Sequence, residues 1–307
     1  MLITVENLTK AYGPQKAVNN ISFEIKTGEV VGFLGPNGAG KSTTMKMISC
    51  YMTPTNGDVK LDQYSIHAEP EEIKKRIGYL PENNPLYTEM PILEYLRFTA
   101  EIQGMEKSRI SERIHEMVEL CGLDIEKHKK IGELSKGYRQ RVGLAQAMIH
   151  DPEVLILDEP TTGLDPNQII EIRKLIKKLG KEKTVLLSSH ILSEVEATCD
   201  RILIINKGRI VADGTSSTLR QEAQGQELLT VQIEAENGEV KKELLKLASV
   251  ATVEPVEDKE SFFRVQSKPE SSSRKSVFDL CVKKKWYLTE MTGIETRLED
   301  VFRELTN

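Results

Sequence analysis

The sequence predicts an α/β fold followed by a smaller α+β domain. An apolar strand at 30–34 leads through a glycine-rich loop into an amphipathic helix that runs to Ile48. A second apolar stretch, Val154–Leu157, has no polar residue on either face, which is typical of a parallel strand covered by helices on both sides. From Leu228 the predicted order becomes strand, helix, strand, strand, helix, strand, the split β-α-β pattern of a ferredoxin-like domain.

The N-terminal residues predict an antiparallel hairpin. Apolar and polar residues alternate over 2–8 and 21–25, and Lys10–Pro14 supplies the turn between them. Tyr12 belongs to this turn and stands upstream of the glycine loop. Its ring could stack on a purine base or pack under the turn, and the sequence leaves both interpretations open.

The glycine loop predicts a phosphate-binding site. Glycines let successive backbone N–H groups turn toward an anion, and the helix that follows adds partial positive charge at its N-terminus. A glycine turn that only joins a strand to a helix is the simpler alternative. In a phosphate-binding loop, Lys41 reaches the β- and γ-phosphates of a nucleotide and the Ser42 hydroxyl coordinates Mg²⁺. The predicted binding residues are Gly35, Pro36, Asn37, Gly38, Ala39, Gly40, Lys41, Ser42 and Thr43.

A charged, mostly helical insert occupies about 85–150. It follows a strand at 77–80, which the segment Pro81–Pro85 terminates. Its last helix is expected from about Lys136 to His150, with Ser135 as the N-cap.

Acidic residues follow the buried strand at 154–157. Asp158 and Glu159 stand at its carboxyl end, where ligands bind in open α/β sheets. Facing a phosphate loop, Asp158 can hold Mg²⁺ and Glu159 can polarise an attacking water. His190 ends a neighbouring strand and could hydrogen-bond the γ-phosphate. The alternatives are two acids that merely end a strand and a histidine with a structural role.

The chain turns polar over 216–226, which predicts a domain boundary. We expect a first domain at 1–218 and an α+β domain at 226–307, closed by an amphipathic helix with Leu298 and Phe302 on its apolar face. The second domain shows no catalytic motif, and Lys283–Lys285 is typical of a solvated face.

The net charge, the cysteine spacing and the length of the apolar runs narrow the class of protein. The 307 residues carry 42 basic and 47 acidic side chains, a net charge of −5, which gives no support to nucleic acid as a partner. The four scattered cysteines predict reduced thiols in the cytoplasm. No signal peptide is expected at the N-terminus, and no apolar run approaches the roughly 20 residues that span a bilayer.

These motifs resemble those of the ATP-binding cassette (ABC) ATPases, the nucleotide-binding subunits of ABC transporters and members of the P-loop NTPases. Five features match in order: Tyr12, the Gly35–Ser42 loop, Leu134–Tyr138 as the signature, Ile156–Glu159 with Gly163–Asp165 after it, and His190. The resemblance covers residues 1 to about 218. It implies a homodimer in which Ser135 and Gly137 of one copy bind the ATP held by the other, with Asp165 also at the nucleotide.

Two motifs depart from the family pattern. Glu82 stands where the family usually has glutamine; a carboxylate there can still bind Mg²⁺ but adds negative charge near the triphosphate. The signature commonly reads Ser-Gly-Gly-Gln, and here it reads Ser-Lys-Gly-Tyr. Lys136 could partly balance the charge of Glu82.

The resemblance implies an ATP hydrolase on the inner face of the cell membrane that energises export through a separate permease. A soluble ABC ATPase acting on ribosomes or DNA is the alternative, although such proteins usually carry a long coiled-coil insert or two cassettes. A GTPase is expected to carry an Asn-Lys-x-Asp motif that binds the base. The nearest match, Asn206–Arg209, lacks the aspartate. The segments 77–87 and 296–302 resemble drug- or polysaccharide-export and gliding-motility-associated members.

Overall fold

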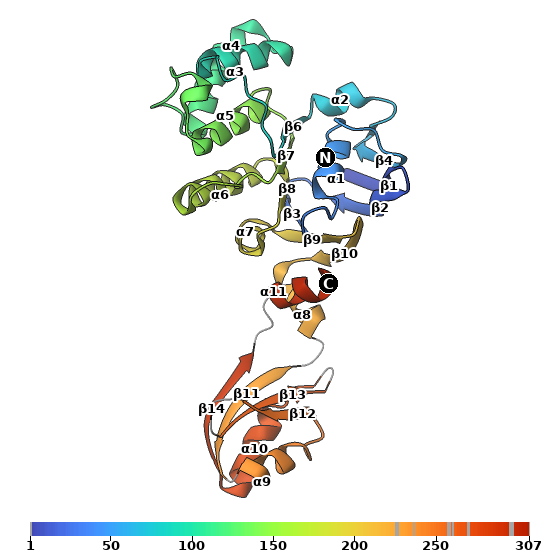
Figure 1. Cartoon of the computed structure of the whole chain (residues 1–307), viewed down its shortest axis with the longest axis vertical. Coiled ribbons are helices and arrows are strands. Elements are labelled where there is room, and N and C mark those ends of the chain that lie inside the picture. Colours follow the sequence, from blue (N-terminus) through green and yellow to red (C-terminus); the bar gives the residue numbers. More distant parts are fainter. Residues whose placement is uncertain are drawn as a thin grey trace. The chain divides into compact units, whose positions relative to one another are not determined.

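The computed structural model describes residues 2–224, 227–235, 237–256, 259, 261–268, 271–294 and 298–306. Two compact units make up the chain, one comprising Met1–Ser216 with Leu305–Asn307 and the other Ser217–Glu304. Figure 1 shows the elements of both units. The limits 1–218 and 226–307 remain our proposal for the domains. Gln226, Glu257, Thr296 and Arg297, which the sequence predictions include, lie outside the described residues.

A six-stranded sheet forms the centre of the first unit. Its strands stand in the order β10-β9-β3-β8-β7-β6. All neighbouring pairs are parallel except β9 with β10, which form a hairpin. The strands are β3 (Val30–Leu34), β6 (Ile77–Leu80), β7 (Val154–Asp158), β8 (Thr184–Ser189), β9 (Arg201–Asn206) and β10 (Arg209–Gly214).

The central strands are apolar because both of their faces are covered. Every residue of β3, β7 and β8 is buried. Helices α6 (Pro166–Gly180) and α7 (Leu192–Thr198) lie on one side of the sheet, and α1 (Lys41–Ile48) lies on the other (Figure 1). The apolar runs predicted as buried parallel strands are therefore confirmed.

The N-terminal hairpin belongs to a four-stranded sheet with the order β2-β1-β4-β5. Its strands are β1 (Ile3–Tyr12), β2 (Gln15–Ile25), β4 (Asn56–Leu61) and β5 (Tyr64–Ser65). The predicted antiparallel pairing of β1 and β2 is confirmed, but both strands are longer than the alternation indicates. Three shifts in the β1–β2 register interrupt the alternation, and the turn narrows to Gly13 and Pro14.

The insert is helical, as predicted. It contains α3 (Ile92–Ile102), α4 (Lys107–Leu120), a 3₁₀ turn at Ile131–Glu133 and α5 (Lys136–Met148), and α2 (Pro70–Lys74) precedes it. Gly104, with a left-handed φ of 72°, separates α3 from α4. Ser135 is the N-cap of α5, since its hydroxyl accepts the Tyr138 N–H at 3.3 Å.

The second unit follows the predicted order of elements. They are β11 (Leu228–Glu234), α9 (Asn237–Leu244), β12 (Val250–Pro255), β13 (Phe262–Ser267), α10 (Arg274–Lys284) and β14 (Tyr287–Ile294). The strands form an antiparallel sheet in the order β12-β13-β11-β14. Helix α8 (Ser216–Gln224) precedes these elements and α11 (Leu298–Thr306) follows them.

The end of α11 belongs to the first unit. The Asn206 side-chain amide donates to the Leu305 carbonyl at 3.1 Å, and both residues lie in that unit. Two segments of chain therefore join the units.

None of the described helices has both the length and the apolar composition that a membrane crossing requires.

Candidate functional site

A cavity opens at the carboxyl ends of β3, β7 and β8. Its volume is about 530 Å³. The lining combines the glycine loop with one residue of β2 and with residues that follow β6, β7 and β8. These are Ala17, Asn37, Gly38, Gly40, Lys41, Ser42, Thr43, Glu82, Glu159, Thr162 and His190.

The glycines of the loop are needed for conformation and for space. Gly38 and Gly40 have φ of 77° and 112°, in the region that favours glycine. A Cβ on Gly40 would stand 2.5 Å from the Ala17 carbonyl oxygen, and one on Gly35 would stand 2.4 Å from that of Ile205. The loop enters α1 directly, so its N–H groups and the helix dipole favour an anion in the cavity.

Lys41 projects back over the loop. Its ammonium donates to the carbonyl oxygens of Gly35, at 2.8 Å, and Pro36, at 3.2 Å. It also lies 3.7 Å from a carboxylate oxygen of Glu159, and both side chains are only 6% exposed. A buried ammonium beside the loop provides the positive charge that a triphosphate requires.

Asp158 connects the loop to the central strands. Its Oδ1 accepts the Ser42 hydroxyl at 3.1 Å and the Ser188 hydroxyl at 2.6 Å. Burial raises the pKa of Asp158 above its usual range, and the two hydroxyl hydrogen bonds oppose this rise. The neighbouring carboxylates of Glu82 and Glu159 raise it further.

These oxygen groups fit a magnesium ion. Mg²⁺ prefers oxygen ligands and usually binds through one or two carboxylates together with phosphate oxygens and water. Ser42 and Asp158 meet this requirement, and Glu82 lines the same cavity. Among the described residues no group of three or more His, Cys, Asp and Glu side chains could hold a metal. Ser42, Asp158 and Glu82 therefore suit an ion that also binds phosphate oxygens and water.

Glu159 and His190 form a hydrogen-bonded pair at the wall of the cavity. His190 Nδ1 lies 2.9 Å from Glu159 Oε2, and the Thr162 hydroxyl donates to the same oxygen at 3.3 Å. The Glu159 backbone has a left-handed φ of 51°, and its N–H donates to the Ser188 hydroxyl at 2.9 Å. A strained backbone of this kind persists only where its surroundings hold it.

Tyr12 does not line this cavity. It ends β1, its side chain is half exposed, and its hydroxyl lies 3.1 Å from the Met52 sulfur. The Lys10 ammonium stands 5.6 Å from the ring centroid. Stacking of this ring on a purine stays a prediction.

Ser135, Gly137 and Asp165 also lie outside the lining. Gly137 is buried at the start of α5, and a Cβ on it would stand 2.5 Å from the Gln168 side chain. Asp165 caps α6, where its carboxylate accepts the N–H groups of Asn167 and Gln168, both at 3.0 Å. The role of Ser135 and Gly137 toward the nucleotide of a second copy, and that of Asp165 at the nucleotide, stay predictions.

Lys136 lies against Gly163, because a Cβ on that glycine would stand 2.0 Å from the lysine ammonium. No ion pair joins Lys136 to Glu82 in the part of the chain that the structure describes. Compensation between these two charges stays a prediction.

Three residues of the site were not anticipated from the sequence. Ala17 and Thr162 line the cavity, and Ser188 binds both Asp158 and the Glu159 N–H. Ser188 did leave a signal, since it is a polar residue at the end of the apolar run 184–187. Thr162 and Ala17 left none.

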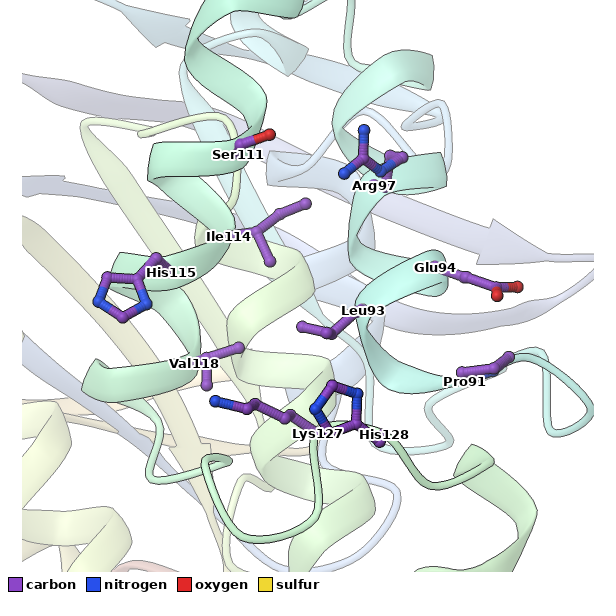
Figure 2. Close-up of a pocket in the computed structure, with 10 residues that line it drawn as sticks. All are labelled: Pro91, Leu93, Glu94, Arg97, Ser111, Ile114, His115, Val118, Lys127 and His128. Carbon is purple, nitrogen blue, oxygen red and sulfur yellow. The ribbon is translucent and has the colours of Figure 1, made fainter.

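A larger cavity, of about 690 Å³, lies in the helical insert (Figure 2). Leu93 of α3 and Ile114 of α4 extend toward each other there, whereas Glu94 and His115 point away from the space between them (Figure 2). None of the predicted site residues lines it. The smaller cavity, in contrast, is lined by Lys41, Glu159 and His190, and we therefore take it as the site.

Comparison with known proteins shows the family of the chain. The family model described as ABC transporter matches residues 18–162. Bacitracin transport ATP-binding protein BcrA of Bacillus licheniformis is 42% identical over 214 residues, covering 69% of each chain. Nod factor export ATP-binding protein I of Burkholderia orbicola (strain AU 1054) is 35% identical over 230 residues, covering 75% of this chain and 76% of the relative.

Solved structures show the same fold. A dimeric ATP-binding cassette in a post-hydrolysis state, bound to ADP and Pi, superposes with a TM-score of 0.64 at 28% identity. The match covers 69% of this chain and 98% of the cassette. The predicted P-loop fold is confirmed, and the chain belongs to the ATP-binding proteins of ABC transporters and is an ATP hydrolase.

Proposed function

We propose that this protein binds ATP with Mg²⁺ and, as a homodimer, energises export through a separate integral membrane permease. The names of its relatives support export: they include bacitracin transport, Nod factor export and linearmycin resistance proteins. These names refer to different substances and none refers to gliding motility, so the proposal names no cargo. Binding to a permease would keep the protein in the cytoplasm at the inner face of the membrane.

The observation that carries the catalytic part of this proposal is the convergence of Lys41, Glu159 and His190. The Glu159 carboxylate contacts both other side chains, at 3.7 Å to Lys41 and 2.9 Å to His190, at the wall of the cavity. A lysine, a carboxylate and an imidazole together provide a phosphate anchor, a base and a hydrogen-bonding group for the transferred phosphate.

Each residue has a separate role in this proposal. The loop N–H groups and Lys41 bind the β- and γ-phosphates. Ser42, Asp158 and Glu82 would hold Mg²⁺, which would supply positive charge against these phosphates. Glu159 orients the attacking water and accepts its proton. His190 orients Glu159 and donates to the γ-phosphate.

The homodimer completes the site. Ser135 and Gly137 do not line the cavity of their own chain, and in this proposal they bind the nucleotide of a second copy. The dimeric state of the solved cassette supports this arrangement.

The Glu159→Gln variant tests the catalytic proposal. Glutamine keeps the size of the side chain but cannot accept a proton, so we expect kcat for ATP hydrolysis to fall by about 100-fold or more while ATP still binds. We expect the trapped ATP to shift the protein to a dimer in size-exclusion chromatography. The control is Glu153→Gln, at an exposed residue paired with Arg76. Hydrolysis by Glu159→Gln at the wild-type rate would remove Glu159 from catalysis.

Purification from native membranes tests the transport proposal. We expect a multi-span membrane protein to co-purify with the full chain. Recovery of ribosomes or DNA instead would favour the soluble ABC ATPase.

A further inference from the structure

A buried carboxylate behind the site has no role in the mechanism above. Glu194, in the first turn of α7, is only 4% exposed. Its Oε2 accepts the Thr161 hydroxyl at 2.5 Å and the Ser189 hydroxyl at 3.2 Å. Both hydroxyl groups are themselves buried.

These two hydroxyl groups belong to the segments that carry the catalytic pair. Thr161 lies two residues after Glu159, and Ser189 directly precedes His190. The Ser189 hydroxyl also accepts the Ile191 N–H at 3.0 Å, so its hydrogen bonds reach both sides of His190. A single carboxylate oxygen thus links the chain after β7 to the end of β8.

A buried charge needs such partners to be tolerated. Removing a carboxylate from water costs several kcal/mol unless hydrogen bonds and an opposite charge compensate. Here the two hydroxyl groups bind Oε2, and the Arg173 guanidinium lies 3.6 Å from Oε1. Thr161, which Glu194 binds, lies two residues after Glu159, whose backbone has a left-handed φ of 51°. A strained backbone of this kind must be held in place by its neighbours.

We propose that Glu194 is a positioning residue that holds Glu159 and His190 at their 2.9 Å separation by binding Thr161 and Ser189. The inference rests on the proposed roles of Glu159 and His190. Since Glu194 does not touch the cavity, it acts on the rate of hydrolysis and not on nucleotide binding.

The first test compares Thr161→Val with Thr161→Ser. Valine has the shape of threonine but no hydroxyl, whereas serine keeps the donor. We expect Thr161→Val to lower kcat by about 10- to 100-fold, because small displacements of catalytic groups have effects of this size. KM for ATP should stay within about threefold, and Thr161→Ser should restore most of kcat.

The second test places Glu194→Gln in the wild type and in Glu159→Gln. If Glu194 acts through Glu159, its loss should lower kcat about tenfold or more in the wild type but less than about twofold in Glu159→Gln. Equal fold-losses in the two backgrounds would overturn the proposal. Thermal unfolding identifies any variant that fails to fold, and the Thr161 pair then carries the test.

The control is Glu196→Gln, which changes a second carboxylate of the same helix; this carboxylate accepts the Ser216 hydroxyl, which belongs to neither of the segments that carry the catalytic pair. We expect wild-type kcat from it. A wild-type protein without ATP hydrolysis would overturn the proposed function itself. An active wild type together with wild-type kcat in folded Thr161→Val would overturn the role of Glu194 alone.

Discussion

Each unit of the molecule contains a carboxylate bound by serine hydroxyls, and the two differ in what surrounds them. Asp158 ends β7 and accepts hydroxyls from Ser42 and Ser188 beside an open cavity. Glu227 precedes β11 and accepts the Ser267 hydroxyl at 3.2 Å and the Ser273 N–H at 2.9 Å. Neither carboxylate lines a described cavity itself, but Ser42, which binds Asp158, lines the site cavity, whereas Ser267 and Ser273 line none of the described cavities.

The pKa values of these carboxyls shift in opposite directions. Burial raises the pKa of Asp158, and the negative charges of Glu82 and Glu159 add to the rise. Burial also acts to raise the pKa of Glu227, but hydrogen bonds, chiefly from the Arg274 guanidinium at 2.9 Å, bring it below its usual range.

The difference shows which kind of polar cluster marks a reactive site. Around Glu227 an adjacent cation and hydrogen bonds satisfy the charge, so the cluster stabilises the start of α10. Asp158 instead keeps two other carboxylates nearby, an arrangement that is unfavourable until a cation enters. A cluster beside a cavity in which the carboxylates of Glu82, Asp158 and Glu159 outnumber the Lys41 ammonium therefore indicates a site better than burial of polar groups alone does.

The largest effect should come from Asp158→Asn. Asparagine can still accept the Ser42 and Ser188 hydroxyls but has no charge for Mg²⁺. We expect ATP hydrolysis to fall by about 100-fold or more, with a higher Mg²⁺ concentration needed for half-maximal rate. The matched change, Glu227→Gln, should leave the rate unchanged. An unchanged Mg²⁺ requirement in Asp158→Asn would contradict the comparison.

Removal of one buried hydroxyl from each cluster should have a smaller effect. Ser188→Ala and Ser273→Ala each leave buried hydrogen-bonding groups without a partner, so both should lower the free energy of unfolding by about 1–3 kcal/mol. Only Ser188→Ala should also slow ATP hydrolysis, by roughly tenfold. Urea unfolding followed by Trp286, the chain's one tryptophan and part of the second unit, reports on Ser273→Ala. A slowed ATPase in Ser273→Ala would show that the clusters are not independent.

The smallest effect concerns pH. The folded pKa of Glu227 is lowered, so the unfolded chain holds its proton at higher pH than the folded chain does. Its stabilisation is therefore complete above the ordinary glutamate pKa, about 4.3, and is lost as pH falls through the lower folded value. We expect the Trp286 unfolding midpoint to drop less between neutral and acid pH in Glu227→Gln than in the wild type. Parallel pH profiles would show that Glu227 contributes nothing to this dependence.

Local sequence patterns predicted the parts of the fold that depend on short-range chemistry. The buried parallel strands followed from uninterrupted apolar runs, and the start of α5 followed from Ser135. The phosphate-binding loop followed from glycines whose observed φ values only glycine adopts readily. The lengths of β1 and β2 did not follow, because register shifts interrupt the alternation on which the prediction depends.

The site was predicted residue by residue but not as a set of contacts. Asp158, Glu159 and His190 were chosen because they end strands. The hydrogen bonds that Asp158 and Glu159 make with Ser188 depend on the pairing of β7 with β8, whose residues are about 30 positions apart. A strand-end serine in a sequence does not reveal which carboxylate it binds. Glu194 was missed for the same reason, since its partners come from two other segments.

The return of the chain at Leu305 affects how the second unit can be removed. Because Leu305 accepts the Asn206 amide within the first unit, the second unit is topologically an insertion and not a tail. A stop codon after Ser216 would delete this closing hydrogen bond together with the unit. An internal excision that rejoins the chain before Leu305 would keep it, so the two shortened proteins are not equivalent.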